Sequence, residues 1–217
     1  YKDEEWVLKD VSFSIKKGQT AAFVGATGAG KTTIINLISR FYPIQKGEIR
    51  IDGININDMN LKDLRRNISV VLQDVFLFSG SIRENITLNT ELSDETVANA
   101  LKLSCADAFI DELPHQMDEI VTERGSTFSA GQRQLLAFAR TIAHNPSIFV
   151  LDEATANIDT KTEKLIQKSI ENVSADRTTL IIAHRLSTIR NADVIFLIRK
   201  GRIVESGNHE ALMELGG

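Results

Sequence analysis

The segment most able to do chemistry is the run Gly25–Thr32, which fits the phosphate-loop pattern GxxxxGK[ST]. Glycines let backbone N–H groups turn inward around phosphate oxygens, and the N-terminal end of a following helix adds favourable potential. Lys31 is placed to reach the β- and γ-phosphates, and Thr32 to offer its hydroxyl to Mg²⁺, which keeps most of its octahedral shell from water and phosphate. The pattern predicts a site for magnesium ATP; the alternative is an ordinary glycine turn.

Two acids follow a different apolar run. Asp152 and Glu153 come directly after Ile148–Leu151, and buried carboxylates are costly without a cation or a proton. In a phosphate-loop protein we expect Asp152 to hold Mg²⁺, usually through water, and Glu153 to polarise the attacking water. The alternatives are a helix N-cap for Asp152 and a solvated charge for Glu153.

His184 ends a further apolar run, Thr179–Ala183. A lone histidine in this position is more often a satisfied residue at the end of a sheet than a catalyst. Because strand ends of an α/β sheet face the nucleotide at the switch point, we expect His184 to contact the γ-phosphate. The other three histidines lie in polar or helix-end contexts and are assigned no role.

The elements that must position these residues begin with a parallel sheet. Four short apolar runs lack alternation, which is typical of strands buried on both faces of such a sheet; they are Thr20–Val24, Ile148–Leu151, Leu180–Ala183 and Val194–Ile198. The phosphate loop lies between the first run and a helical pattern that includes Ile34 and Ile35, so the local order is strand, loop, helix.

Two further regions have other periodicities. Val7–Ile15 and Glu48–Asp52 alternate, which predicts a small antiparallel sheet on one side. From about Ser81 to Asn145 the pattern is helical, with an acidic helix start at Ser93, and Pro146 follows its end. We predict an α/β fold whose core, with the antiparallel β region, covers 1–80 and 146–217, and whose inserted helical subdomain covers about 81–145.

Composition narrows the class of protein. The 217 residues, 42% of them hydrophobic, are enough to bury the core of one domain. The net charge is −4, from 25 basic and 29 acidic residues spread along the chain, so there is no basic stripe that would bind nucleic acid. The single cysteine, Cys105, is expected to be a packed helix side chain. No stretch approaches the roughly 18 apolar residues of a membrane span. The abrupt ends suggest a domain taken from a longer chain.

At this point the residues resemble the nucleotide-binding domain of ABC transporters, over essentially the whole chain. The run Phe128–Gln132, here called the signature turn, is similar to the family signature Leu-Ser-Gly-Gly-Gln. Gln73 matches the Q-loop glutamine, residues 156–159 match the D-loop, and His184 matches the switch histidine. Tyr1 matches the aromatic residue that stacks on adenine. The resemblance implies a P-loop NTPase core of the RecA-like type over 1–217, with ATP and Mg²⁺ bound.

The resemblance also assigns roles residue by residue. The catalytic residues are Glu153, His184 and Gln73, and the residues near Mg²⁺ are Thr32, Gln73 and Asp152. The nucleotide contacts it implies are Tyr1, Gly25, Ala26, Thr27, Gly28, Ala29, Gly30, Lys31, Thr32, Thr33, Ser129, Gly131, Gln132 and Asp159.

A second subunit is part of this expectation. A phosphate loop without an arginine finger lacks donors on the outer side of the γ-phosphate. Ser129 and the backbone N–H of Gly131, at a helix N-terminus, suit an oxyanion, and the resemblance implies that they serve a facing nucleotide-binding domain, with two ATP molecules between the two copies. Hydrolysis would then open the pair.

The resemblance further points to exporters with six fused membrane helices. Glu123–Gly125, just before the signature turn, and Ser81–Ile86 are similar to segments of that group. Glu123 would lie in the loop that senses the coupling helices of the transmembrane domain, although a plain surface charge is the alternative. The expected place is therefore the cytoplasmic face of a membrane. Competing interpretations are the separate ATPase of an importer and an ATP-driven clamp on DNA or a ribosome, which usually carries a basic, zinc-bearing or coiled-coil insertion.

The signature turn departs from the family pattern at Phe128 and Ala130. A methyl group where glycine is usual is expected to crowd the γ-phosphate or to remove a permitted backbone angle. The resemblance implies that heterodimeric exporters of this group often pair a subunit that has an altered signature and keeps the catalytic glutamate with a partner that has lost its own. We therefore expect a heterodimer, with a homodimer as the alternative.

Overall fold

The computed structural model describes residues 6–122, 125–152, 158–175, 177–182 and 186–215. The chain divides into two compact units. The first unit contains residues 1–69, 150–153 and 178–217, and the second contains residues 70–149 and 154–177. Tyr1, Glu153 and His184 lie outside the described residues, as do Glu123 and the first two residues of the D-loop, Ala156 and Asn157.

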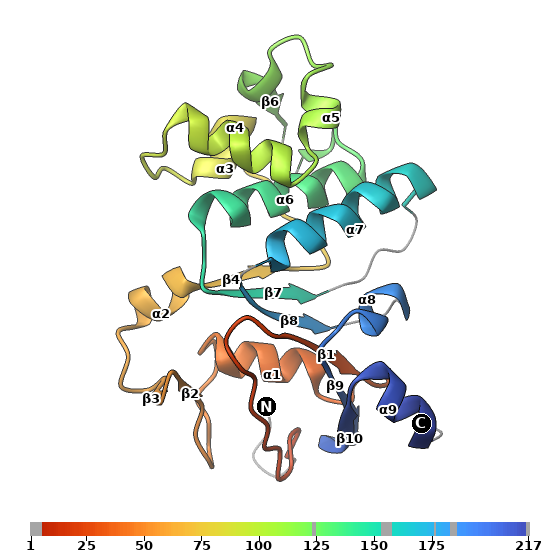
Figure 1. The fold of residues 1–217 in the computed structure, drawn as a ribbon. Helices are drawn as coiled ribbons and strands as arrows, with labels where there is room; N and C mark the ends of the chain where they lie inside the picture. Colours follow the sequence, from red (N-terminus) through yellow and green to blue (C-terminus); the bar gives the residue numbers. More distant parts are fainter. Residues whose placement is uncertain (1–5, 123–124, 153–157, 176, 183–185, 216–217) are drawn as a thin grey trace. The chain divides into compact units, whose positions relative to one another are not determined.

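A mainly parallel sheet is built as the apolar runs predict (Figure 1). Its strand order is β10-β9-β1-β8-β7-β4. β1 pairs in parallel with β8 and with β9, while β10 returns antiparallel to β9. The α/β fold with buried parallel strands is thereby confirmed, and the boundary between the units passes through β4 and β7. The bounds of the strands are β1 Thr20–Val24, β4 Ile68–Val71, β7 Ile148–Asp152, β8 Thr178–Ile182, β9 Val194–Arg199 and β10 Arg202–Gly207.

The core of the first unit lies on the two central strands. Ala21, Ala22 and Phe23 of β1 are fully buried, as the absence of alternation predicts. The first unit also contains the helices α1 Lys31–Ile38, α2 Leu61–Asn67, α8 Leu186–Arg190 and α9 His209–Leu215, and the short antiparallel pair β2 Arg50–Ile51 and β3 Ile54–Asn55.

The prediction of a strand at Val7–Ile15 is wrong, because these residues, all of them described, adopt no strand. Their alternation has another cause. The ring of Phe13 packs against those of Phe23 and Phe196, with centroids 5.4 and 5.1 Å away. The segment is therefore held by side-chain packing and by a backbone hydrogen bond from the N–H of Lys9 to the carbonyl oxygen of Gly201 at 2.8 Å. Among the described residues, the small antiparallel pair near the predicted strands is β2 with β3.

Helices dominate the second unit (Figure 1). α6 is flanked by α3, α4 and α7, and Leu135 and Phe138 on α6 are buried completely or almost so. Ser93 caps α4 by accepting a hydrogen bond from the N–H of Thr96, as the acidic helix start suggested. The bounds are α3 Ile82–Thr87, α4 Asp94–Leu103, α5 Asp107–Ile110, η1 Gln116–Asp118, α6 Ala130–His144 and α7 Thr160–Ser174, with a strand pair β5 Gly80–Ser81 and β6 Ile120–Val121.

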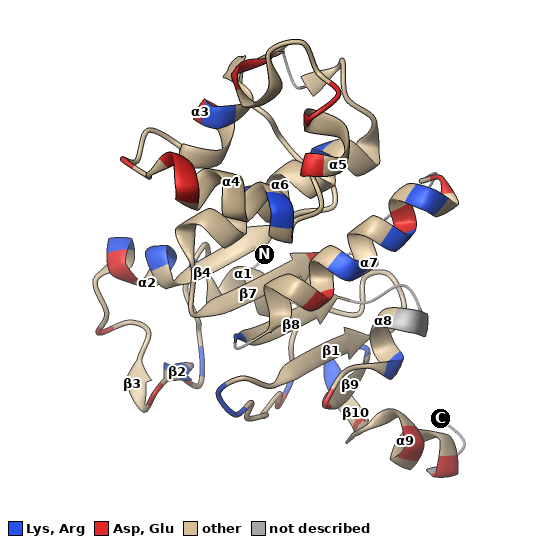
Figure 2. Ribbon diagram, turned by 45° about the horizontal axis from the view of Figure 1, so that its top comes forward, with Lys and Arg blue, Asp and Glu red and all other residues tan. Residues whose placement is uncertain are grey.

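Charged residues of both signs are interspersed along α2 and along α7 (Figure 2). This mixture agrees with the small net charge of the sequence. Cys105 is buried, but it follows α4 instead of lying within it, and burial raises the pKa of its thiol. Among the described helices, none has the length and hydrophobicity that a membrane span requires.

Candidate functional site

The phosphate loop connects β1 to α1 within the first unit. Gly25 and Gly30 have φ angles of 148° and 111°, in the region that favours glycine. A Cβ atom on Gly25 would lie 2.2 Å from the carbonyl oxygen of Ile198 on β9, so no side chain fits there. The loop therefore begins pressed against the neighbouring strand and turns directly into the helix.

Lys31 points back into this loop. Its Nζ donates hydrogen bonds to the carbonyl oxygens of Gly25, at 2.7 Å, and Ala26, at 3.1 Å. The residue is only 6% exposed. Burial lowers the pKa of Lys31, and the negative charge of Asp152 partly opposes this effect. The loop thus holds a cation at its centre, with a carboxylate close enough to act on it.

The N-terminus of α1 completes an environment suited to phosphate. Its first turn, Lys31–Ile34, contains no acidic residue, so the helix end keeps its positive potential for an anion. Thr32 is exposed, which leaves its hydroxyl accessible to a metal ion, and Thr33 is half-buried beside it. The residues present therefore fit a magnesium-bound polyphosphate: backbone amides, one ammonium group and one hydroxyl oxygen.

A hollow of about 410 Å³ borders the same loop. Gly25–Ala29 line one side of it, and Leu197–Lys200, at the end of β9, line the other. Both sides belong to the first unit. The loop is accordingly accessible from its surroundings and is not buried within the core.

Asp152 is the last residue of β7 and is half-buried. It lies at the end of the strand, and its negative charge acts on Lys31, while its role toward a metal ion remains a prediction. Glu153 follows immediately in the sequence but lies outside the described residues, so its role remains a prediction. The same holds for His184 and Tyr1.

The signature turn lies in the second unit, where Ser129 is the N-cap of α6. The Ser129 hydroxyl oxygen accepts a hydrogen bond from the N–H of Gln132 at 3.2 Å, and Oε1 of Gln132 accepts one from the N–H of Ser129 at 2.9 Å. This reciprocal capping box engages the Gln132 side chain locally. A serine hydroxyl that accepts one bond still has its own hydrogen to donate, so Ser129 can cap the helix and also bind an anion.

Ala130 is the first residue of α6 and is exposed. Its backbone is helical and not in the left-handed region, so the expected loss of a permitted backbone angle does not occur. Phe128, the other departure, is buried and packs edge-on against Phe109, with centroids 5.9 Å apart. Neither change disturbs the cap itself.

Two more residues that were predicted to contact the nucleotide, Asp159 and Gln73, lie in the second unit. Asp159 is exposed and caps α7 by accepting a hydrogen bond from the N–H of Thr162 at 3.0 Å. Hydrogen bonds from the side chain and backbone of Thr162 lower the pKa of the Asp159 carboxyl. Gln73 is also exposed. Each of these side chains is thus accessible, but its contact with a nucleotide remains a prediction.

Sequence reasoning missed a polar cluster that follows Gln73 along the chain. Asn85, 2% exposed, donates through Nδ2 to the carbonyl oxygens of Phe78 and Ser81, and its Oδ1 accepts from the N–H of Phe78. Arg140 of α6 donates through Nε to the backbone oxygen of Asn85, and burial lowers its pKa. The sequence signal that could have revealed this cluster is a polar residue among the apolar positions of each helix, Asn85 in α3 and Arg140 in α6.

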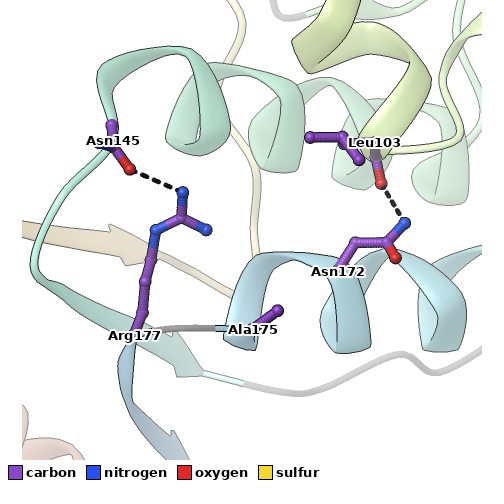
Figure 3. A pocket seen from close by; sticks show the side chains of 5 residues that line it. All are labelled: Leu103, Asn145, Asn172, Ala175 and Arg177. Atoms are coloured by element: carbon purple, nitrogen blue, oxygen red, sulfur yellow. Dashed lines mark hydrogen bonds between the residues drawn. The ribbon is translucent and has the colours of Figure 1, made fainter. Parts of the chain in front are cut away.

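A second hollow, of about 420 Å³, lies where α4, α6 and α7 end (Figure 3). Arg177 donates to Oδ1 of Asn145 at 2.8 Å, and Asn172 donates to the carbonyl oxygen of Leu103 at 2.7 Å. Arg177 also donates to the carbonyl oxygen of Val173 at 2.7 Å. Helix C-termini carry partial negative charge, and these donors offset it, so the hollow has a structural explanation.

Known proteins provide an independent comparison. The model of the ABC transporter family matches residues 8–156. The chain is 54% identical over 217 residues to a putative ABC transporter ATP-binding protein, exp8, of Streptococcus pneumoniae, covering 100% of this chain and 37% of that protein. It is 52% identical over 218 residues to a probable multidrug resistance ABC transporter ATP-binding/permease protein, YheH, of Bacillus subtilis, covering 100% and 32%.

Two further similarities concern a flippase and a solved structure. The chain is 47% identical over 216 residues to an ATP-dependent lipid A-core flippase of Haemophilus influenzae, covering 99% of this chain and 37% of that protein. It matches the structure of a bacterial Atm1-family ABC exporter with ATP bound at a TM-score of 0.93 and 40% identity, covering 100% and 38%. The chain thus spans well under half the length of these relatives.

Proposed function

The chain belongs to the ABC transporter family, and from this premise we propose that it is the ATP-binding and ATP-hydrolysing domain of an exporter. The observation that carries the proposal is the buried Lys31, which bonds two carbonyl oxygens of the phosphate loop at the N-terminus of α1. An ammonium group, backbone amides and a helix end together form a binding site for the phosphates of ATP.

Binding of ATP requires the Lys31 ammonium group to exchange its present hydrogen-bond partners. Lys31 now bonds the carbonyl oxygens of Gly25 and Ala26. When ATP binds, its β- and γ-phosphates replace these carbonyls as the partners of the ammonium group, and the loop N–H groups turn to phosphate oxygens. A charge-assisted bond to phosphate is stronger than one to a neutral carbonyl, so the exchange favours binding.

Mg²⁺, when bound, neutralises charge on the β- and γ-phosphates. The Thr32 hydroxyl and Asp152 would hold it, with Gln73 as the further predicted ligand.

Glu153 is proposed as the residue that polarises the attacking water, and His184 as a contact to the γ-phosphate. The support for Glu153 is its place directly after β7, whose last residue Asp152 acts on Lys31. The support for His184 is its place shortly after β8, which pairs with the strand that leads into the phosphate loop. Proton acceptance by Glu153 lets water attack phosphorus as the bond to ADP breaks.

A second nucleotide-binding domain is proposed to complete each site. The Ser129 hydroxyl retains a hydrogen to donate while its oxygen caps α6, and the N-terminal amides of that helix favour an anion. Facing the ATP of the other subunit, this turn would supply the donors that the phosphate loop lacks. The further partner is a transmembrane domain, with the ATP site on the cytoplasmic face of the membrane. The names of the similar proteins, a flippase and ATP-binding/permease proteins among them, support export.

The subunit pairing is proposed to be a heterodimer. The support is Ala130 in place of the usual signature glycine, together with Glu153 and His184 retained in the sequence. The structure limits the effect of Ala130, because its methyl group lies on an exposed helical residue. To test the pairing, ATP turnover and oligomer composition are measured for the native protein and for Ala130→Gly. Two identical, fully active sites would refute the heterodimer.

The proposed function is tested with Lys31→Met and Glu153→Gln, using calorimetric titration with magnesium ATP and a turnover assay. We expect Lys31→Met to abolish binding, and Glu153→Gln to retain binding and lose turnover. Lys62→Met, which removes an exposed lysine of α2, is the matched control and should change neither. Binding that survives Lys31→Met undiminished would overturn the assignment of the phosphate loop.

A further inference from the structure

Gly131, in the signature turn, has no room for a side chain. Its backbone is helical and it is buried, so no unusual φ angle requires the absence of a side chain. A Cβ atom at this position would lie 2.3 Å from Cγ2 of Thr162 on α7. Carbon atoms in contact are normally separated by about 3.5–4.0 Å. The first turns of α6 and α7 therefore approach each other as closely as a glycine permits.

Thr162 cannot yield easily at this contact. A β-branched side chain in a helix has few allowed χ1 rotamers, and Thr162 lies in the first turn of α7. The backbone N–H of Thr162 donates to the same carboxylate at 3.0 Å. The methyl group of Thr162 thus faces the signature turn while its backbone N–H holds the cap of α7.

We propose that Thr162 is a positioning residue that joins the signature turn to Asp159, and that glycine is required at position 131 by the Thr162 methyl group. One residue then fixes the place of Ser129, two positions before Gly131, relative to the D-loop aspartate. This inference rests on the proposed function, in which the signature turn completes the ATP site of a facing subunit.

The effect on turnover follows from the size of the conflict. To accommodate a Cβ atom on residue 131, α6 and α7 must separate by about 1 Å if contacts are to reach normal carbon separations. A misplacement of about 1 Å at a catalytic group can cost on the order of a hundredfold in rate. Gly131→Ala is thus expected to lower kcat by about this factor. The affinity for ATP should fall much less than kcat, because the phosphate loop lies in the first unit and keeps its own contacts.

Compensation provides the decisive measurement. Thr162→Ser removes the obstructing methyl group and keeps the hydroxyl, and the remaining neighbours of a Cβ at position 131, Cβ of Thr162 and Cγ2 of Ile158, lie at 3.4 Å. The double variant Gly131→Ala with Thr162→Ser should therefore recover at least roughly tenfold of the hundredfold loss in kcat. Gly131→Ala with Thr162→Val is the matched control: valine keeps the methyl group, so kcat should stay low.

The experiment uses the natural protein that contains residues 1–217, and it measures kcat, the affinity for magnesium ATP by calorimetry, and thermal unfolding. If Gly131→Ala fails to fold, the serine double variant should fold and the valine double variant should not. Absence of compensation by Thr162→Ser, in kcat or in folding, would overturn the inference. A native protein that neither binds nor hydrolyses ATP would instead refute the proposed function, so the two failures are distinguishable.

Discussion

Replacement of Asn85 by alanine should destabilise the second unit markedly. The Asn85 side chain makes three hydrogen bonds to the backbone of residues 78–81, two with Phe78 and one with Ser81. It is 2% exposed, so water cannot easily replace it. The alanine variant leaves these backbone groups without the partner that holds the loop between Gln73 and α3.

The magnitude follows from the number of bonds. Each intramolecular hydrogen bond contributes about 1 kcal/mol net, so three bonds correspond to a loss of about 3 kcal/mol in the free energy of unfolding. For a chain of this length, 1 kcal/mol shifts the Tm by about 2–4 °C, so the expected decrease is about 6–12 °C. Equilibrium unfolding in urea gives the free energy, and calorimetry gives the Tm.

The control is Asn99→Ala on α4, where the asparagine is exposed. Alanine has the higher helix propensity, so this variant should be neutral or slightly more stable. A destabilisation by Asn85→Ala of less than about 1 kcal/mol, the contribution of a single bond, would refute the argument that Asn85 holds the loop.

Three other predictions concern the caps and the polar hollow. Ser129→Ala should reduce the free energy of unfolding, measured in urea, by about 1 kcal/mol through loss of the N-cap. Ser129→Thr keeps a hydroxyl group and should reduce this free energy less. Equal reductions in the two variants would contradict the capping role of Ser129. The pKa of Asp159 is lowered in the folded state, so its charge contributes stability that is present above its unfolded pKa, about 3.9, and is lost as the pH falls through the folded pKa. The difference in unfolding free energy between the native protein and Asp159→Asn should therefore shrink as the pH falls from neutral to below this range, and a difference independent of pH would count against it. Arg177→Lys should lower the free energy of unfolding by about 1–2 kcal/mol, because lysine cannot reproduce both hydrogen bonds of the guanidinium group. Arg190→Lys, at an exposed helix end, is the control. Equal unfolding curves for the two variants would contradict a stabilising role for the Arg177 bonds.

The parallel sheet could be predicted from sequence because its physical cause is local. Strands buried on both faces need continuous apolar residues, and the runs that became β1, β7, β8 and β9 show this directly. The same logic failed at Val7–Ile15, where alternation reflects the packing of Phe13 on two other rings and not a ladder of backbone hydrogen bonds.

The phosphate loop was equally predictable, since glycine spacing, lysine and the following helix are all adjacent in the chain. The reason for glycine at position 131 could not be predicted from sequence. It depends on contact with Thr162, which lies about thirty residues later in the chain. The hydrogen bonds of the Asn85 side chain depend in the same way on the fold, because a loop must bring the backbone groups of Phe78 and Ser81 to it. The roles of Glu153, His184 and Tyr1 remain predictions from sequence.

The sheet register has a consequence for how the chain is made. Within residues 1–217, β1 precedes both of its neighbours, β8 and β9, by a long stretch of chain, and Thr20 pairs with Thr179. Contacts between residues so distant in sequence slow folding, because the loop-closure entropy is paid before the contacts form. The ribosome must therefore release the residues as far as β8 before the strand that leads into the phosphate loop gains either neighbour. During that interval its apolar residues depend on chaperones or transient collapse to avoid aggregation.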